Sequence, residues 1–257
     1  MYPSFFWSLA EPSDEIGLRE VRHINGLYLF LDELARRHPG LILDNCASGG
    51  RRLDFEMMRR CVALWRSDSC WGDPTFPRNV QAMTHGLSHW LPLHGLGAAA
   101  ADHIALRSGM GACASYAINF HDPGAVEALR QHLARYLRVR PLFAKDYYPL
   151  TSWSDDPARL LAFQFHDRAT GKGLVQAFRA PKTRTADLHL RLQGLTPTAR
   201  YTLLDWDGVL DPLTLRGSEL MEKGLALDSE HLPVALVIEY SPAHVNAGHI
   251  RSRGDRR

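Results

Sequence analysis

The residues most capable of chemistry lie in one stretch, 41–68, with the sequence LILDNCASGGRRLDFEMMRRCVALWRSD. It contains two short apolar runs, 41–43 and 62–65, and each run ends in polar residues. Runs of this kind are typical of buried strands in a parallel sheet, whose carboxyl ends carry the ligand-binding residues. The glycines after the first run let backbone N–H groups approach a ligand, because glycine has no Cβ. We expect Asp68, after the second run, to lie beside that glycine loop.

This stretch resembles the catalytic core of glycoside hydrolase family 36, the α-galactosidase family. The resemblance depends on the motif CASGGR at 46–51 with Asp54, followed by WRSD at 65–68 at the spacing of the family. It implies an acid/base role for one residue and a galactose-lining role for three others. These residues are Asp68 as the general acid/base, and Cys46, Ser48 and Gly49 as pocket lining. The family requires no metal or cofactor, so we expect none.

Arg66 precedes Asp68 by two residues and has two readings. It either takes part in the site, by binding a sugar hydroxyl or by holding the acid/base, or it forms a salt bridge inside a barrel. Trp65 reads more readily as a core residue than as a sugar platform, because each tryptophan buries a large apolar area. Three histidines, His85, His89 and His94, suggest a metal site at first sight. No carboxylate or cysteine joins them at ligand spacing, so we expect no metal there.

Retaining glycoside hydrolysis needs two carboxyl groups about 5–5.5 Å apart, one as nucleophile and one as acid/base. The resemblance places the nucleophilic aspartate on an earlier barrel strand, and residues 1–7, MYPSFFW, resemble the segment that follows it. We therefore expect the nucleophile to be encoded upstream, and the chain to be a C-terminal portion of such an enzyme. Asp44, Asp54 and Asp122 are poor substitutes, since Asp54 suits a helix cap better.

Composition narrows the class of protein. The 257 residues carry a formal net charge of +2, too small to indicate nucleic acid or a membrane surface as partner. No run is long and apolar enough to cross a bilayer, and the N-terminus lacks the basic region of a signal peptide. The four cysteines form no CxxC pair, so reduced thiols and a cytoplasmic location are expected.

The first 150 residues alternate between helical and strand patterns. An apolar stripe predicts a helix over about 16–37, with Ser13 as its cap and Pro39-Gly40 as its end. Strands should end near residues 46, 68, 94 and 120, and the third of them is expected at 91–93, with a glycine-rich loop at 95–97 after it. Helices are predicted at 55–61, 78–90, 104–110 and 125–139. We interpret residues 1–150 as α/β, the C-terminal half of a (β/α)8 TIM barrel.

After residue 141 the pattern changes to a period of two, in segments such as LLAFQFHD, GLVQAFRA and ALVIEYSP separated by turn residues. This predicts a small antiparallel β-sandwich over 157–241, which fits the C-terminal β-domain of the family. Residues 242–257 are basic and predicted to be disordered.

The sequence thus predicts an α-galactosidase-like hydrolase that removes terminal α-galactosyl residues from oligosaccharides. Three alternatives stay open: a raffinose-synthase-type galactosyl transferase, an α-N-acetylgalactosaminidase, and a non-catalytic sugar-binding remnant. An α-galactoside is the expected partner, with no nucleic acid and no membrane. A half barrel would leave open sheet edges, which favour pairing with a second copy, so a homo-oligomer is a further hypothesis.

Overall fold

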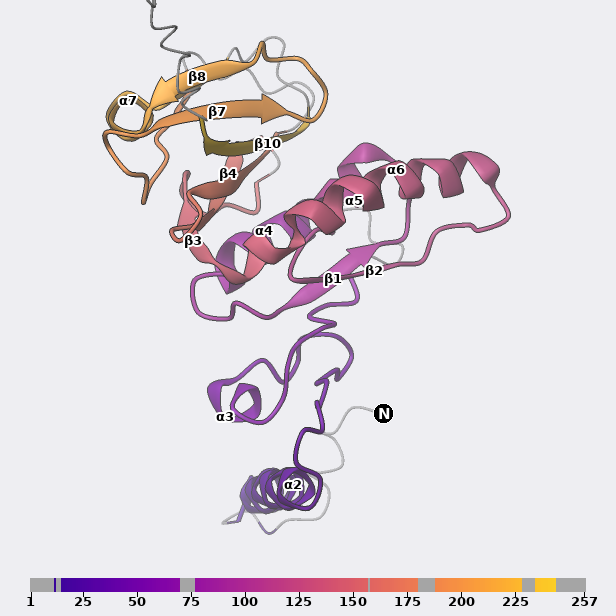
Figure 1. The fold of residues 1–257 in the computed structure, drawn as a ribbon. Coiled ribbons are helices and arrows are strands. Elements are labelled where there is room, and N and C mark those ends of the chain that lie inside the picture. The colour runs from indigo at the N-terminus through magenta and orange to yellow at the C-terminus, as the bar shows by residue number, and fades with distance from the viewer. Residues whose placement is uncertain are drawn as a thin grey trace, which may run out of the picture. The chain divides into compact units, whose positions relative to one another are not determined.

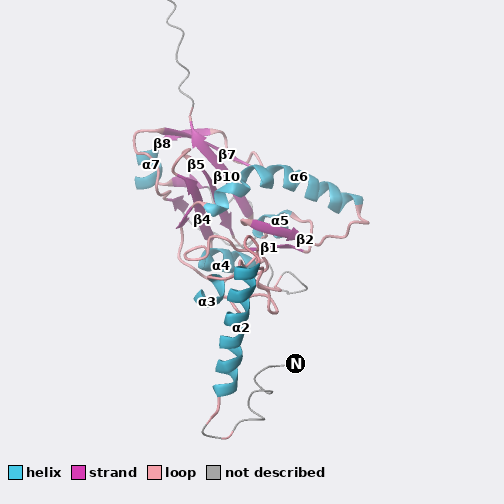
Figure 2. Ribbon diagram, turned by 60° about the horizontal axis from the view of Figure 1, so that its bottom comes forward, coloured by secondary structure: helices cyan, strands magenta, loops and turns pink. Residues whose placement is uncertain are grey.

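A computed structural model describes residues 12, 15–69, 77–156, 158–179, 188–227 and 234–243. By their contacts the residues group into two compact units, Met1–Asp68 and Ser69–Arg257. The first unit is helical with irregular segments, and the second combines helices with all of the named strands (Figure 1, Figure 2). Because the two units are not placed relative to one another, each is described by itself.

The first unit contains α2, Leu18–Arg37, and the short α3, Phe55–Met58. Helix α2 begins after Gly17, whose φ of 90° is a left-handed conformation that favours glycine. Arg36 and Arg37 occupy its last turn, where cations suit the negative end of the helix dipole. The helix predicted from the apolar stripe is therefore confirmed. Its expected cap, Ser13, lies outside the described residues.

The second unit begins with alternating helices and strands: α4 Arg78–Leu87, β1 Gly95–Ala98, α5 His103–Ser108, β2 Cys113–Tyr116 and α6 Pro123–Val139. Strands β1 and β2 pair in parallel, with Gly95 opposite Cys113, and α5 connects them. This is a βαβ unit, as the alternation predicted. Asp102 and Asp122 cap α5 and α6 by accepting backbone N–H bonds, at 2.9 and 2.8 Å.

The strand expected at 91–93 lies instead at Gly95–Ala98, within the glycine-rich segment. The reason is close packing of backbones. A Cβ placed on Gly97 would lie 1.5 Å from the Ser115 carbonyl oxygen, and one on Gly109 would lie 2.4 Å from the Gly97 oxygen. Glycines that read as a loop in sequence are thus needed where the strand, its partner and α5 approach one another.

The remaining elements are mostly antiparallel strands. Six of them form one sheet in the order β3-β4-β5-β10-β7-β8, and β6 pairs with β9 in a second, two-stranded sheet. Their bounds are β3 Asp146–Pro149, β4 Leu161–Asp167, β5 Lys172–Phe178, β6 Leu188–Leu190, β7 Arg200–Asp205, β8 Leu213–Arg216, β9 Leu225–Leu227 and β10 Ala235–Pro242. The 3₁₀-helix η1, Arg140–Ala144, precedes β3, and α7, Gly217–Glu222, follows β8.

The central strands β4, β5 and β10 are buried on both faces. One face packs on β6, β9 and α7 through side chains such as Leu190, Leu220 and Leu225. The other packs on α5, α6 and η1 through Met110, Val139 and Phe143. Helices α5, α6 and η1 therefore cover one face of the sheet, and the small second sheet together with α7 covers the other.

Polar side chains inside these strands have partners. Gln164 Nε2 donates to the Tyr240 hydroxyl at 2.6 Å, and that hydroxyl lies 3.0 Å from His166 Nδ1. Gln176 Nε2 donates to the Arg107 carbonyl oxygen at 3.0 Å. The buried strands thus tolerate polar residues because each one is hydrogen-bonded.

The antiparallel part that the sequence predicted is present, and it starts earlier than residue 157, because β3 at Asp146–Pro149 already pairs with β4. Residues 244–257, most of the predicted disordered tail, lie outside the described residues. Within the described part of the chain, no helix combines the length and hydropathy needed to cross a membrane.

Candidate active site

The two apolar runs of the 41–68 stretch are neighbours. Asp44 and Val62 form a parallel bridge, in which Asn45 N donates to Val62 O at 2.8 Å and Val62 N donates to Leu43 O at 2.8 Å. The Asp44 carboxylate extends this pairing by accepting the backbone N–H of Leu64 at 3.0 Å. The predicted adjacency of these two segments is confirmed, although each forms a single bridge rather than a full strand.

The bend after the first run packs directly on the end of the second. Ser48 and Gly49 both have positive φ, 49° and 73°, so the chain turns sharply there. A Cβ built on Gly49 would lie 2.6 Å from Ser67 Cα and 2.7 Å from Asp68 N. A Cβ on Gly50 would lie 2.3 Å from the Arg66 carbonyl oxygen. The two glycines are therefore required by backbone contact with residues 66–68.

Hydrogen bonds also hold the rest of this bend in place. The Asn45 side-chain amide donates to the Arg52 carbonyl oxygen at 2.7 Å, and Arg52 donates to the Cys46 carbonyl oxygen at 3.3 Å. The Cys46 thiol is free, and Cys46 and Ser48 are both exposed. Their side chains are thus available to a ligand, whereas Gly49 is buried against the backbone.

Asp68 is exposed at the end of the second segment. Its Oδ1 accepts a hydrogen bond from Trp65 Nε1 at 2.8 Å. Trp65 is half-buried, and through this hydrogen bond it contacts the proposed acid directly. The sequence did not predict this role for Trp65. Its position three residues before Asp68 in the WRSD motif is the signal that could have indicated this contact.

Arg66 is 3% exposed. Burial lowers the pKa of its guanidinium to about 9, which still keeps the group charged near neutral pH. Ser67 is buried as well. The two residues that precede Asp68 are thus buried, while Asp68 itself is exposed.

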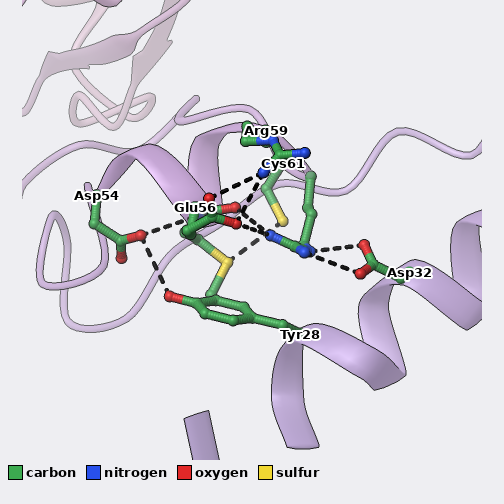
Figure 3. A network of polar contacts seen from close by, with 8 residues as sticks. Tyr28, Asp32, Asp54, Glu56, Arg59 and Cys61 are labelled. Atoms are coloured by element: carbon green, nitrogen blue, oxygen red, sulfur yellow. Dashed lines mark hydrogen bonds and ion pairs between the residues drawn. The ribbon is translucent and has the colours of Figure 1, made fainter. Parts of the chain in front are cut away.

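A second polar network joins α2 to α3 (Figure 3). Arg60 donates to both Asp32 oxygens, at 2.7 and 2.9 Å, and to Glu56 at 2.9 Å, and its guanidinium lies 4.7 Å from the centre of the Tyr28 ring. Asp54 caps α3 by accepting Met57 N at 2.8 Å, which confirms the predicted capping role. The Arg60–Asp32 pair spans 28 residues of sequence, and no local pattern indicated it.

The other carboxylates weighed as nucleophiles are engaged by backbone N–H groups. Asp44 accepts Leu64 N, Asp54 caps α3 and Asp122 caps α6. Each of these aspartates therefore has a local structural role.

The three histidines do not converge on one point. His85 Nε2 lies 2.9 Å from the Thr151 carbonyl oxygen, whereas His94 Nε2 lies 3.1 Å from the Ser88 hydroxyl. His85 and His89 are ring neighbours, with centroids 5.9 Å apart. Among the described residues, no group of three or more histidine, cysteine, aspartate or glutamate side chains could hold a metal ion.

Comparisons with known proteins agree with this geometry. The family model named Melibiase matches residues 10–108, and the model of the glycosyl hydrolase family 36 C-terminal domain matches residues 160–253. The α-galactosidase AgaA of Geobacillus stearothermophilus is 28% identical over 224 residues, which cover 80% of this chain and 29% of that protein. The region matched by the Melibiase model includes the whole 41–68 stretch.

Solved structures share the fold. The α-galactosidase from Lactobacillus brevis superposes with a TM-score of 0.73 at 20% identity, covering 94% of this chain and 34% of that one. The crystal structure of the family 36 α-galactosidase AgaA gives a TM-score of 0.71 at 22% identity, covering 91% and 33%.

The matched models and the α-galactosidase relatives make the chain similar to glycoside hydrolase family 36 over both matched regions. The solved structures show that it shares their fold. It spans less than a third of the length of the curated relatives that it matches, with 29%, 20% and 26% of three α-galactosidase sequences covered.

Proposed function

We propose that this chain contributes the acid/base part of an α-galactosidase active site, in an enzyme that cleaves terminal α-galactosyl residues with retention. The observation that supports this most is the packing of Gly49 on the backbone of Asp68, within two paired parallel segments. It brings the exposed thiol-and-hydroxyl bend and an exposed carboxylate to one end of the pair. Relatives named α-galactosidase supply the reaction class.

In this proposal Asp68 protonates the leaving-group oxygen and then, as a base, activates the water that releases the sugar. Cys46, Ser48 and Gly49 line the position of the terminal galactose. Arg66 is buried, so we assign it to holding the end of the segment rather than to a sugar hydroxyl. The nucleophilic carboxylate comes from outside these 257 residues, in keeping with the partial coverage of the relatives.

We further propose that the βαβ unit and the 43–64 pair are parts of the C-terminal half of a (β/α)8 barrel. The proposed division of the chain is a barrel part over 1–150 and a β-sandwich over 157–241. The two family models favour a boundary between residues 108 and 160, and the antiparallel sheet begins at Asp146. The contact-based division at Asp68 differs from this boundary, because α4, α5 and α6 pack with the antiparallel sheet.

A titration of the chain with galactose, followed residue by residue by NMR, tests the proposed site. Signals of residues 46–49 and 68 should move together, and glucose should move them less. Without the nucleophile, the chain should show negligible hydrolysis of 4-nitrophenyl α-galactoside. Robust hydrolysis that survives Asp68→Asn would place the acid elsewhere. Galactose binding that leaves residues 46–68 unaffected would contradict the proposed pocket.

A galactosyl transferase of the same family is the second candidate function. It differs from a hydrolase in accepting a sugar hydroxyl instead of water. A longer enzyme that contains this chain, incubated with an α-galactoside and an acceptor sugar, would distinguish them. A transfer product in excess of free galactose would favour the transferase.

A further inference from the structure

The second unit contains an open groove between α4 and the segment 151–155. Its volume is about 390 Å³, within the range of small-ligand sites. The lining includes Asn79, Ala82, Gly86, Trp90, Trp153 and Asp155. None of these residues belongs to the proposed active site, and the function above does not use them.

The groove is built by side-chain contacts that fix one wall to the other. Trp153 Nε1 donates to the Ala82 carbonyl oxygen at 3.0 Å, and Arg78 donates to the Ser154 carbonyl oxygen at 2.7 Å. His85 Nε2 lies 2.9 Å from the Thr151 carbonyl oxygen. Arg78 and His85 are buried. These three contacts hold the segment along α4, so the groove does not depend on a mobile side chain.

Two exposed indole rings line the groove. Trp153 is 54% exposed although its N–H is already bonded, so its accessible surface is that of the apolar ring. Trp90 is 38% exposed in the same groove. Indole rings are otherwise among the side chains that bury most area, so two exposed ones around one hollow indicate a ligand-binding role.

The groove lining also contains polar side chains that can hydrogen-bond to a ligand. Asn79 offers an amide, and Asp155 offers a carboxylate that is exposed. Among the described residues that line the groove, Asp155 is the only charged one, and its negative charge disfavours phosphate and other anionic ligands. A neutral sugar ring has an apolar C–H face for an indole and hydroxyls for the amide and the carboxylate.

We propose that this groove is a second saccharide-binding site, which takes a neutral sugar by stacking it on Trp153 and Trp90. Asn79 and Asp155 bind its hydroxyls. Such a site would hold an oligosaccharide to the protein independently of hydrolysis. This proposal goes beyond the catalytic role assigned to residues 46–68.

Titration of the ¹⁵N-tryptophan-labelled chain with raffinose tests the proposal. The indole N–H signals of Trp90 and Trp153 should shift and saturate, while sorbitol, an acyclic polyol without a ring face, should leave them unchanged. Trp153→Ala and Trp90→Ala should each weaken binding at this site about five-fold, the scale of one aromatic contact. Leu137→Ala, a change of an exposed apolar residue on α6, is the matched control and should have no effect.

Trp153→Phe separates stacking from folding, since it keeps a ring and loses only the bond to Ala82. It should retain more of the affinity than Trp153→Ala. Unchanged indole signals at saturating raffinose would overturn the proposal. So would a dimer, seen by sedimentation velocity, that dissociates in Trp153→Ala, because the groove would then be an interface. The indole signals are read separately from those of residues 46–49, so failure here is distinct from failure of the proposed active site.

Discussion

Trp65 donates its indole N–H to Asp68 Oδ1 at 2.8 Å, and this bond joins the first and last residues of the WRSD motif. It fixes one oxygen of an exposed carboxylate against a half-buried ring. An acid/base residue must present its carboxyl group in a defined orientation to the bond it protonates. Trp65 therefore serves as a positioning residue in the proposed site, through Asp68.

The bond itself can be tested in the chain as it stands. Asp68→Ala removes the acceptor, so the Trp65 indole N–H should exchange with solvent about five-fold faster, the scale of one net hydrogen bond. NMR of the ¹⁵N-tryptophan-labelled chain measures this. Asp32→Ala is the control, because Asp32 accepts from Arg60 instead. Equal exchange in wild type and Asp68→Ala would show that the indole is bonded elsewhere.

Gly49→Ala should loosen the bend and the paired segments beneath it. The new Cβ would meet backbone atoms of Ser67 and Asp68 within 2.6–2.8 Å, and φ is +73°. We expect a loss of about 1–3 kcal/mol, as for a strained backbone position. Hydrogen exchange at the amides of Asn45 and Val62, which bond across the pair, provides the measurement.

Gly26 supplies the matched control for this substitution. It lies in α2, and a Cβ there would meet nothing within 4 Å. Gly26→Ala should stabilise the helix by about 0.5–1 kcal/mol, since glycine is a poor helix former. If both substitutions had the same effect, the close approach of the bend to Asp68 would be wrong.

The ion pair between Arg107 and Asp207 should be a major contributor to the second unit. Arg107 lies on α5 and donates to both Asp207 oxygens at 2.6 Å, and its side chain is 4% exposed. Asp207→Ala would leave a buried charge without its carboxylate, at a cost of about 3 kcal/mol. Arg130→Ala, which breaks the exposed pair with Glu127 on α6, should cost less than about 1 kcal/mol.

Urea unfolding followed by circular dichroism compares the two variants. Because Asp207 follows β7, the loss in Asp207→Ala should also appear as weaker attachment of α5 to the sheet. Faster amide exchange in α5 and at Ala235, whose carbonyl oxygen accepts from Arg107, would show this. A cost as small as that of the exposed pair would contradict the assignment.

His132 should make the second unit sensitive to acid. Burial, with the nearby charges of Arg107, His103 and Arg135 as lesser causes, lowers the pKa of its imidazole to about 4. The unfolded chain takes up the proton near pH 6.5, before the folded chain does. Stability from this group is therefore full above pH 6.5 and falls as the pH drops toward 4, by about 3 kcal/mol at most.

His132→Gln should flatten the dependence of the unfolding free energy on pH between 6.5 and 4. Tyr116→Phe is the matched variant, because it removes only the hydroxyl that lies 2.9 Å from His132 Nε2. It should keep the dependence, since burial is the main cause. Urea unfolding at several pH values measures both. An unchanged slope in His132→Gln would assign the acid sensitivity to another group.

Local patterns predicted much of the fold. The apolar stripe predicted α2, Asp54 was predicted to cap the helix that follows it, and the period of two predicted the antiparallel strands. These signals depend on residues within a few positions of one another, so the sequence contains them directly. The motifs at 46–51 and 65–68 likewise indicated the resemblance to glycoside hydrolase family 36.

Long-range contacts decided the rest. The strand expected at 91–93 formed at Gly95–Ala98 because the neighbouring backbones leave no room for a side chain. Strand β3 pairs with β4 and so belongs to the antiparallel sheet. The contacts of Arg107 and Trp153 join residues about 70 to 100 positions apart. The sequence by itself indicated the candidate site residues and most of the helices and antiparallel strands. Only the tertiary structure decided what those residues contact, because packing brings together atoms that no local pattern relates.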